Sequence, residues 1–250
     1  MDQARTKSQA PSPRDFVSKS PSRIAGMFDA IAPRYDFLNH LLSGGIDRAW
    51  RTRAIRSLAL TGRERVLDLC TGTGDLAMAA ARATPGAASV VGVDFAAAML
   101  GVADEKLRRA GERSRVTLVR GDATRIPLAD GSVDALTIAF GIRNVEDVPA
   151  ACAEMHRVLR PRGRLAILEF AVPTLPGWRS LYGWYVRHVL PRIGSAVSRH
   201  GGAYHYLPAS IDAFATPDEL VKILRQSGFA PAAAVPLTLG SVCLYTATRA

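Results

Sequence analysis

A glycine-rich turn and a distant acidic residue constrain the fold of this chain most strongly. Residues 66–75 read Val-Leu-Asp-Leu-Cys-Thr-Gly-Thr-Gly-Asp, and the run Val-Val-Gly-Val-Asp ends at Asp94, twenty residues after Gly74. An apolar run, a glycine turn, a helix and a second apolar run that ends in an acid form the pattern of a nucleotide-binding βαβ unit. The sequence therefore predicts a parallel sheet with a nucleotide site at this turn.

Further apolar runs alternate with helical patterns along the chain, which is typical of a doubly wound α/β fold. Strands are predicted over Arg65–Leu69, Ser89–Asp94, Val116–Arg120, Val133–Ala139 and Arg164–Phe170. Helices are predicted over Leu76–Arg82, Ala98–Ala110 and Val148–Leu159, and Arg160-Pro161-Arg162-Gly163 is predicted as a turn. A helix over Pro217–Gly228 and an antiparallel hairpin, Pro231–Leu237 with Ser241–Arg249, complete a seven-stranded, mostly parallel sheet.

The pattern divides the chain into a tail and one domain. Residues 1–22 are rich in Ser, Pro, Lys and Arg and are predicted to be a disordered tail, and residues 23–250 form a single domain. Short helices are predicted between Ile24 and Leu60. Residues 173–216 follow no strand pattern and are predicted to be a helical and aromatic insertion that covers the substrate.

Composition and charge narrow the class of protein. Hydrophobic residues make up 48% of the chain and charged residues 22%, which is ordinary for a soluble enzyme. The net charge of +10 suits an anionic partner, but the arginines are dispersed, so no nucleic acid is expected. The three cysteines are far apart and predict no metal site. Without a signal or a membrane-spanning run we expect a cytoplasmic protein, whose membrane contact can only be peripheral. A homo-oligomer is compatible with the sequence.

The glycine turn alone fits two nucleotide cofactors. Gly72-x-Gly74-x-x-Ala77 passes as the dinucleotide fingerprint, with Asp94 on the ribose hydroxyls. Asp68 favours another ligand, because a carboxylate beside the turn repels the pyrophosphate of a dinucleotide. S-adenosylmethionine carries an ammonium and a sulfonium and has no phosphate, so it matches an acidic turn.

Three acids at successive strand ends, Asp68, Asp94 and Asp122, define the predicted cofactor site. Asp94 is expected to accept hydrogen bonds from both ribose hydroxyls. Asp122, beside Ala123, is expected to take the adenine amino group. The turn itself, Gly72, Thr73 and Gly74, is predicted to approach the amino-acid part of the cofactor. The competing interpretation is that these acids cap the helices that follow the strands.

Several stretches outside the turn have the pattern of one protein family. They are Met27-Phe28-Asp29, Ala32-Pro33-Arg34-Tyr35-Asp36 with Asn39, the turn from Asp68 to Asp75, Phe140-Gly141-Ile142-Arg143-Asn144-Val145, Glu169-Phe170, and Tyr204 to Ile211. In these stretches the chain resembles the ubiquinone/menaquinone biosynthesis C-methyltransferase family, within the class I S-adenosylmethionine-dependent methyltransferases. The resemblance covers nearly all of the chain after residue 22. It departs at Ala139, where many members carry serine.

The resemblance implies methyl transfer from S-adenosylmethionine to a ring carbon of a polyprenylated quinol such as demethylmenaquinol. It also implies that Tyr35, Asp36 and Asn39 fold over the cofactor. Arg143 and Asn144, at the tip of the fourth strand, are predicted to be catalytic and to support the developing phenolate, with a water as the base. The competing interpretation is that Arg143 pairs with Glu146 or Asp147 and Asn144 caps the next helix.

The aromatic insertion bears on the choice of acceptor. Its aromatic residues are Trp178, Tyr182, Trp184, Tyr185, Tyr204 and Tyr206. We expect them to line a channel for an isoprenoid tail and to face a membrane surface, although ordinary helix packing would give the same composition. Its histidines, His188, His200 and His205, have no identifiable carboxylate partner and are expected to be structural. The alternatives are a methyltransferase for another apolar, lipid-like acceptor and, suggested by charge alone, an RNA methyltransferase or RNA-binding module.

Overall fold

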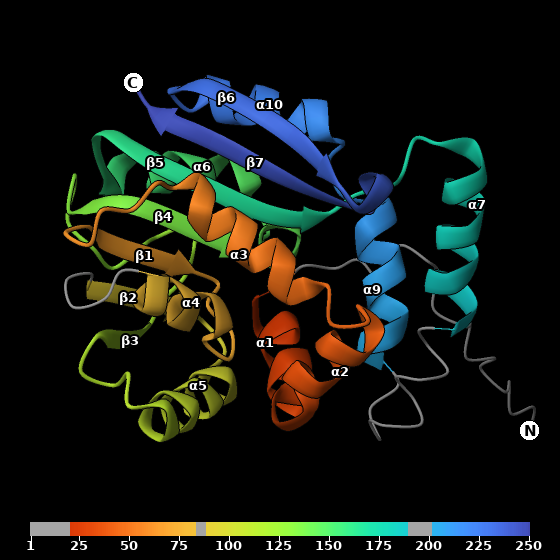
Figure 1. Ribbon diagram of the computed structural model, residues 1–250, viewed down its shortest axis with the longest axis horizontal. Coiled ribbons are helices and arrows are strands. Elements are labelled where there is room, and N and C mark those ends of the chain that lie inside the picture. Colours follow the sequence, from red (N-terminus) through yellow and green to blue (C-terminus); the bar gives the residue numbers. More distant parts are fainter. Residues whose placement is uncertain (1–20, 84–88, 190–201) are drawn as a thin grey trace, which may run out of the picture.

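A single seven-stranded sheet organises the protein. The computed structural model describes residues 21–83, 89–189 and 202–250. The strand order is β3-β2-β1-β4-β5-β7-β6 (Figure 1). The strands are β1 (Arg65–Leu69), β2 (Ser89–Asp94), β3 (Val116–Arg120), β4 (Val133–Ala139), β5 (Leu159–Phe170), β6 (Phe229–Leu237) and β7 (Val242–Arg249). The first five are parallel, and β7 runs antiparallel to both β5 and β6, which confirms the predicted sheet.

Helices cover both faces of the sheet, because the apolar residues of each strand alternate between the two sides. Val66 of β1 packs with α3 and α4, whereas Leu67 on the opposite face packs with α6 and α10. The helices are α3 (Asp47–Ser57), α4 (Asp75–Ala83), α5 (Ala97–Ala110), α6 (Val148–Val158) and α10 (Pro217–Gln226). The predicted helices and strands between residues 65 and 158 are therefore confirmed to within one residue at each end.

Four further helices gather beyond the carboxyl ends of the parallel strands (Figure 1). They are α1 (Pro21–Ile31), α2 (Tyr35–Leu42), α7 (Pro176–Trp184) and α9 (Gly202–Asp212), and the π-helical turn η4 (Tyr185–Val189) extends α7. Helix α1 contacts both α5 and α9, so a helix from the start of the described chain and one from its last quarter meet over this edge of the sheet. Ligands of open α/β sheets bind at this edge.

Two predicted boundaries are wrong, each for a local reason. Strand β5 begins at Leu159 and not at Arg164, because Leu159 already pairs with Val133. At the predicted turn, residues 160–163, the register between β4 and β5 shifts, and Arg162 lies at a φ of 65°. Strand β6 likewise begins at Phe229, which pairs with Arg249 before the register shifts. The predicted tail, apart from residues 21 and 22, lies outside the described residues.

Candidate active site

The glycine turn takes the shape that its sequence predicts. Gly72 lies at a φ of 56°, a left-handed conformation that favours glycine. A Cβ atom at Gly72 would meet no other atom within 4 Å, so this side of the turn is open to a ligand. The backbone N–H of Gly74 donates to the carbonyl oxygen of Thr71 (2.9 Å) and closes the turn just before α4 begins at Asp75.

Asp68 lies under the turn and is buried, with 1% of its surface exposed. Its carboxylate accepts hydrogen bonds from the hydroxyls of Thr71 (2.5 Å) and Thr137 (2.7 Å). Burial raises the pKa of this carboxyl to about 6, although both hydroxyls act to lower it. Asp68 therefore shapes the turn from below, and its charge depends on pH in the mildly acidic range.

Asp94 is the last residue of β2 and lies on the opposite side of the turn. Its carboxylate accepts hydrogen bonds from the backbone N–H groups of Gly72 (2.8 Å) and Ala96 (2.9 Å). Burial raises its pKa, and these two N–H donors act in the opposite direction. The acid thus joins the first glycine of the turn to the start of α5, across 22 residues of sequence.

Asp122 and Ala123 lie on the wall of a neighbouring hollow of about 800 Å³. The same hollow is lined by Cys70, Phe95, Gly141 and Asn144. One oxygen of Asp122 accepts from the N–H (2.7 Å) and the hydroxyl (2.8 Å) of Thr124. Gly141 is required here, because a Cβ atom would lie 2.4 Å from the Cβ of Cys70. The tips of β1, β3 and β4 therefore enclose one space beside the glycine turn.

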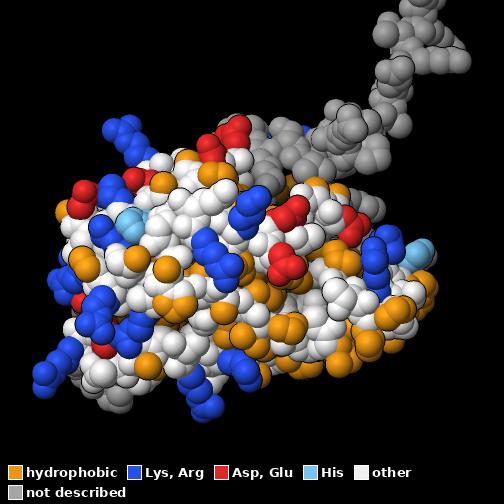
Figure 2. All heavy atoms as spheres, turned by 90° about the horizontal axis from the view of Figure 1, so that it is seen from above, with side chains coloured by type: hydrophobic (Ala, Val, Ile, Leu, Met, Phe, Trp, Pro, Cys, Tyr) orange, Lys and Arg blue, Asp and Glu red, His pale blue; other side chains and the backbone are white. Residues whose placement is uncertain are grey.

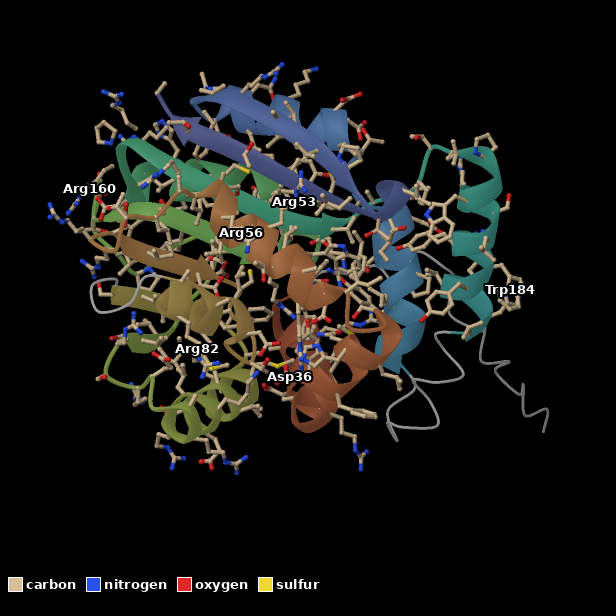
Figure 3. The ribbon with its side chains drawn as sticks, viewed as in Figure 1. Asp36, Arg53, Arg56, Arg82, Arg160 and Trp184 are labelled. Atoms are coloured by element: carbon tan, nitrogen blue, oxygen red, sulfur yellow. The ribbon has the colours of Figure 1, made fainter. Side chains whose placement is uncertain are left out.

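Helix α2 is bound to the glycine turn by side chains. The hydroxyl of Thr73 donates to Asp36, and the ammonium of Lys106 lies 2.5 Å from carboxylate oxygens of both Asp36 and Asp75. Figure 3 shows Asp36 between α2 and the sheet edge. Arg51 of α3 reaches Asp75 as well, at 3.4 Å. The placement of Asp36 against Thr73 agrees with the expectation that α2 folds over the cofactor turn.

A second, largely apolar cavity of about 140 Å³ lies against the first site. Tyr35, Arg51 and Phe140 line both this cavity and a separate, smaller space of about 30 Å³ at the glycine turn itself. Its other aromatic walls come from α1, α3, β5, α7, η4 and α9: Phe28, Trp50, Phe170, Tyr182, Tyr185 and Tyr206. Most of the residues between 173 and 216 that the structure describes are helical, and Tyr182, Tyr185 and Tyr206 line this cavity, whereas Trp178 and Trp184 do not.

Arg143 lies on the wall of the aromatic cavity and is 5% exposed. Its guanidinium lies 2.8 Å from the carboxylate of Glu169 and 5.3 Å from the centroid of the Phe170 ring. It also donates to the carbonyl oxygen of Phe140 (2.5 Å), a residue held at a φ of 57°. Arg143 therefore lies on the cavity wall, and its charge is neutralised by Glu169, which does not line the cavity.

Asn144 is buried next to Arg143 and is joined to the helical insertion. The hydroxyl of Tyr206 donates to its side-chain oxygen at 3.1 Å. The alternative pairing that the sequence allowed is wrong in both parts. Arg143 pairs with Glu169 and not with Glu146 or Asp147, and the residue that caps α6 is Asp147, whose side chain accepts from the N–H of Ala150.

Some contacts of the site could not be predicted from any local sequence pattern, and one could have been predicted but was not. Lys106 contacts Asp36 across 70 residues, and no local pattern predicts that contact. Asp47 and Arg51, at an i,i+4 spacing, could have been predicted to pair, as they do. His40, which the sequence analysis did not consider, lies 2.7 Å from Asp47. His188 contacts the Trp184 carbonyl, and His200 and the His205 side chain lie outside the described residues.

The donor set at the glycine turn fits S-adenosylmethionine better than a dinucleotide. Asp36, Asp68, Asp75 and Asp94 surround the turn, and only Lys106 and Arg51 balance them among the contacts given above. Such an acidic environment favours a cationic ligand over a pyrophosphate. No helix in the described parts of the chain is long and apolar enough to cross a membrane.

Similarity to known proteins agrees with this geometry. The model of the ubiE/COQ5 methyltransferase family matches residues 17–249. A ubiquinone/menaquinone biosynthesis C-methyltransferase of Syntrophotalea carbinolica is 51% identical over 89% of this chain and 92% of the relative. A demethylmenaquinone methyltransferase of Thermus thermophilus is 44% identical over 89% of this chain and all of the relative (100%).

Solved structures of low sequence identity share the fold. The [4+2]-cyclase SpnF superposes with a TM-score of 0.66 at 18% identity, covering 92% of this chain and 96% of that one. A SAM-dependent methyltransferase from Aquifex aeolicus superposes with a TM-score of 0.60 at 18% identity, covering 96% and 100%. The fold is that of class I S-adenosylmethionine-dependent methyltransferases, and the family match covers almost the whole chain. The chain therefore belongs to the ubiE/COQ5 methyltransferase family.

Proposed function

We propose that this protein transfers a methyl group from S-adenosylmethionine to a ring carbon of a polyprenylated quinol, with demethylmenaquinol as the acceptor. The names of the relatives support this class of acceptor, since they include ubiquinone/menaquinone biosynthesis C-methyltransferases and a demethylmenaquinone methyltransferase. The cofactor, when bound, supplies a methyl group on a sulfonium, which is a good leaving group. The protein then has to hold the ring, exclude water and accept the proton that the quinol releases.

One observation carries the proposal: an aromatic cavity adjoins the glycine turn. The cavity volume is about 140 Å³, and an engineered apolar cavity of about 150 Å³ binds benzene. A single aromatic ring therefore fits. Because Tyr35, Arg51 and Phe140 line both spaces, a ring in the cavity would lie next to a ligand at the turn. Such proximity is the main requirement of a group transfer.

The cofactor would be held by the residues predicted from the sequence. We propose that Gly72, Thr73 and Gly74 approach its amino-acid part, with Asp68 supporting the turn from below. Asp94 lies at the tip of β2, where it can accept from ribose hydroxyls, and its present contacts with Gly72 and Ala96 hold the carboxylate in place. Asp122 and Ala123 line the adjoining hollow, which has room for the adenine.

Arg143 and Asn144 are proposed to act at the acceptor ring. Arg143 lines the cavity and can donate a hydrogen bond to a phenolate oxygen, which favours the ionised and more nucleophilic ring. Its pairing with Glu169 reduces the net charge, so the support is mainly that of an oriented donor. Asn144 lies behind it and positions Tyr206, which also lines the cavity.

The surroundings of the cavity support a lipid-like acceptor and a peripheral membrane contact. Large hydrophobic side chains are exposed on α2, the turn after it, and α7: Phe37, Leu41, Ile46, Leu175, Leu181 and Trp184. Figure 2 shows hydrophobic side chains gathered at the end of the molecule where α7 lies, and Trp184 points outward in Figure 3. We propose that the described parts of the insertion, residues 173–189 and 202–216, cover the acceptor and that this end faces the bilayer in which a prenyl tail resides.

Methyl transfer to defined acceptors tests the proposal. Purified protein, S-adenosylmethionine with a labelled methyl group and chemically reduced demethylmenaquinone are incubated without oxygen, with a reduced demethoxy-type benzoquinone and a sterol as alternative acceptors. Label in the naphthoquinol supports the proposal. Label in the benzoquinol alone changes the acceptor within the class, and label in the sterol alone supports the lipid alternative. If no quinol is labelled while the cofactor binds, the quinol function is wrong.

A further inference from the structure

Methylation of a quinol in the aromatic cavity requires a group that accepts a proton. Methylation of a ring carbon forms a carbon–carbon bond and breaks the S–CH₃ bond, whose electron pair stays on sulfur. The ring also loses the hydrogen at that carbon as a proton, while the electron pair of the C–H bond stays in the ring. Each turnover therefore releases one proton into a largely apolar space. A nearby group has to accept that proton.

The cavity wall offers few proton acceptors. Its ionisable side chains in the described parts of the chain are Asp47, Arg51, Arg143 and four tyrosines. Arginine remains protonated in proteins, and burial raises the pKa of Tyr35 and Tyr206, so these phenols stay neutral. Asp47 carries the only carboxylate among the lining residues, and it is 2% exposed.

Asp47 is not isolated, because a histidine contacts it on the side away from the cavity. Its carboxylate lies 2.7 Å from Nδ1 of His40, accepts from the hydroxyl of Ser43 (2.9 Å), and is paired with Arg51. Ser43 lines the cavity with Asp47, whereas His40 does not, and 29% of the His40 side chain is exposed. The pair thus extends from the cavity wall to the protein surface.

We propose that the His40–Asp47 pair accepts the proton released by the reaction and passes it to solvent. This inference rests on the proposed quinol methylation. The quinol O–H or ring C–H bond breaks, and the pair gains the proton, so that its net charge rises from −1 to zero. Asp47 takes the proton from the quinol, and the imidazole, whose Nδ1 contacts Asp47, passes it to the surface. From there it leaves to water and restores the pair.

The charges around the pair are compatible with this path. Burial acts to raise the pKa of the Asp47 carboxyl, but the Ser43 hydroxyl and Arg51 of α3 outweigh it and lower that pKa. Asp75 of α4 contacts the same arginine at 3.4 Å. Arg143 faces the cavity from the opposite wall. An ionised Asp47 beside a neutral imidazole can accept a hydrogen bond from a quinol hydroxyl. Asp47 would then be a catalytic residue, and His40 a positioning and proton-accepting residue that acts through it.

A purely structural role is the competing interpretation, because the same contacts join α2 to α3. The His40→Gln variant separates the two roles, since glutamine can still hydrogen-bond Asp47 but cannot take the proton. We expect kcat for quinol methylation to fall about 100-fold, while the KM for quinol and the Kd for S-adenosylmethionine stay within about twofold. The His156→Gln variant, between α6 and β6, is the matched control and should retain the wild-type kcat.

The pH dependence of the wild-type enzyme gives a second measurement that needs no variant. kcat should fall on the acid side, with a midpoint equal to that of the His40 ring titrated by NMR in the same protein, and His40→Gln should lose this limb. A wild-type kcat that does not follow the His40 titration, or a folded His40→Gln variant with wild-type kcat, would overturn the proposal. If the wild-type enzyme methylates no quinol, the proposed function itself has failed.

Discussion

Arg143 and Glu169 form an ion pair in the interior of the protein, with 2.8 Å between a guanidinium nitrogen and a carboxylate oxygen. The backbone explains the contact, because β4 ends at Ala139, which pairs with Leu168, and Glu169 continues β5 beside the segment that carries Arg143. The pair therefore fixes Arg143 at the wall of the aromatic cavity.

Replacing Glu169 with Gln should destabilise the protein, because it leaves the buried guanidinium without a counter-charge. Removal of one partner of a buried pair costs about 3 kcal/mol or more. We expect a loss of that size in the free energy of unfolding, measured by urea denaturation. The control is Arg82→Gln, which breaks an exposed pair with Glu112 and should change stability by less than about 1 kcal/mol. Equal losses in the two variants would contradict the argument.

The Arg143 pair also shows where sequence-based prediction succeeds and where it stops. The strands could be predicted because both faces are covered, which makes each strand a continuous apolar run. The acids at the strand tips could be placed because parallel strands end at one edge. The competing interpretation named the wrong partner for Arg143, because Glu146 and Asp147 are near in sequence, whereas Glu169 lies 26 residues away on the neighbouring strand.

The cavity was harder to predict than the glycine turn, because it too depends on contacts between residues far apart in the sequence. Its walls come from seven helical elements, one strand and neighbouring loops, which meet only in the folded chain. The density of aromatic residues between 173 and 216 indicated a cover, but not that Tyr206 would contact Asn144. Nor does any local pattern place Lys106 between Asp36 and Asp75, because those contacts span 70 and 31 residues.

Asp94→Asn should weaken cofactor binding and leave the fold intact. The amide can still accept from one of the two N–H groups that Asp94 now holds, but it lacks the charge that strengthens a hydrogen bond from a ribose hydroxyl. We expect the Kd for S-adenosylmethionine to rise about 10-fold to 100-fold by calorimetry. Asp134→Asn, at the opposite end of the sheet, is the control. An unchanged Kd would remove Asp94 from the proposed site.

Exposed hydrophobic residues on α7 should control binding to lipid vesicles. Leu181 and Trp184 are 53% and 55% exposed, and aspartate at either position adds a charge that opposes insertion into a bilayer. We expect Leu181→Asp with Trp184→Asp to reduce co-sedimentation with vesicles that contain anionic lipid at least fivefold. Val235→Asp, an exposed position on the edge strand β6, serves as the control. The membrane assignment fails if the wild-type protein does not sediment, or if the α7 variant sediments as the wild type does.

Asp68 should make stability fall as the pH rises from about 4 to 7. The unfolded carboxyl loses its proton near its ordinary pKa of 3.8, whereas burial holds the folded pKa at about 6. Between these values the folded state binds more protons, so the free energy of unfolding decreases with increasing pH. Ionising Asp68 in the folded protein therefore costs about 3 kcal/mol at neutral pH, and Thr71 and Thr137 already offset part of the desolvation.

Asp68→Asn tests this linkage, because the amide stays neutral at every pH. Its free energy of unfolding relative to the wild type should increase by about 2.5 kcal/mol between pH 4 and pH 7.5, because the unfolded carboxyl is already partly ionised at pH 4. Urea denaturation of both proteins at the two pH values gives that difference, and other titrating groups such as Asp94 cancel from it. Any hydrogen bond lost with the carboxylate shifts both measurements equally. A difference that is constant with pH, or that shrinks as the pH rises, would show that Asp68 is ionised at low cost in the folded protein.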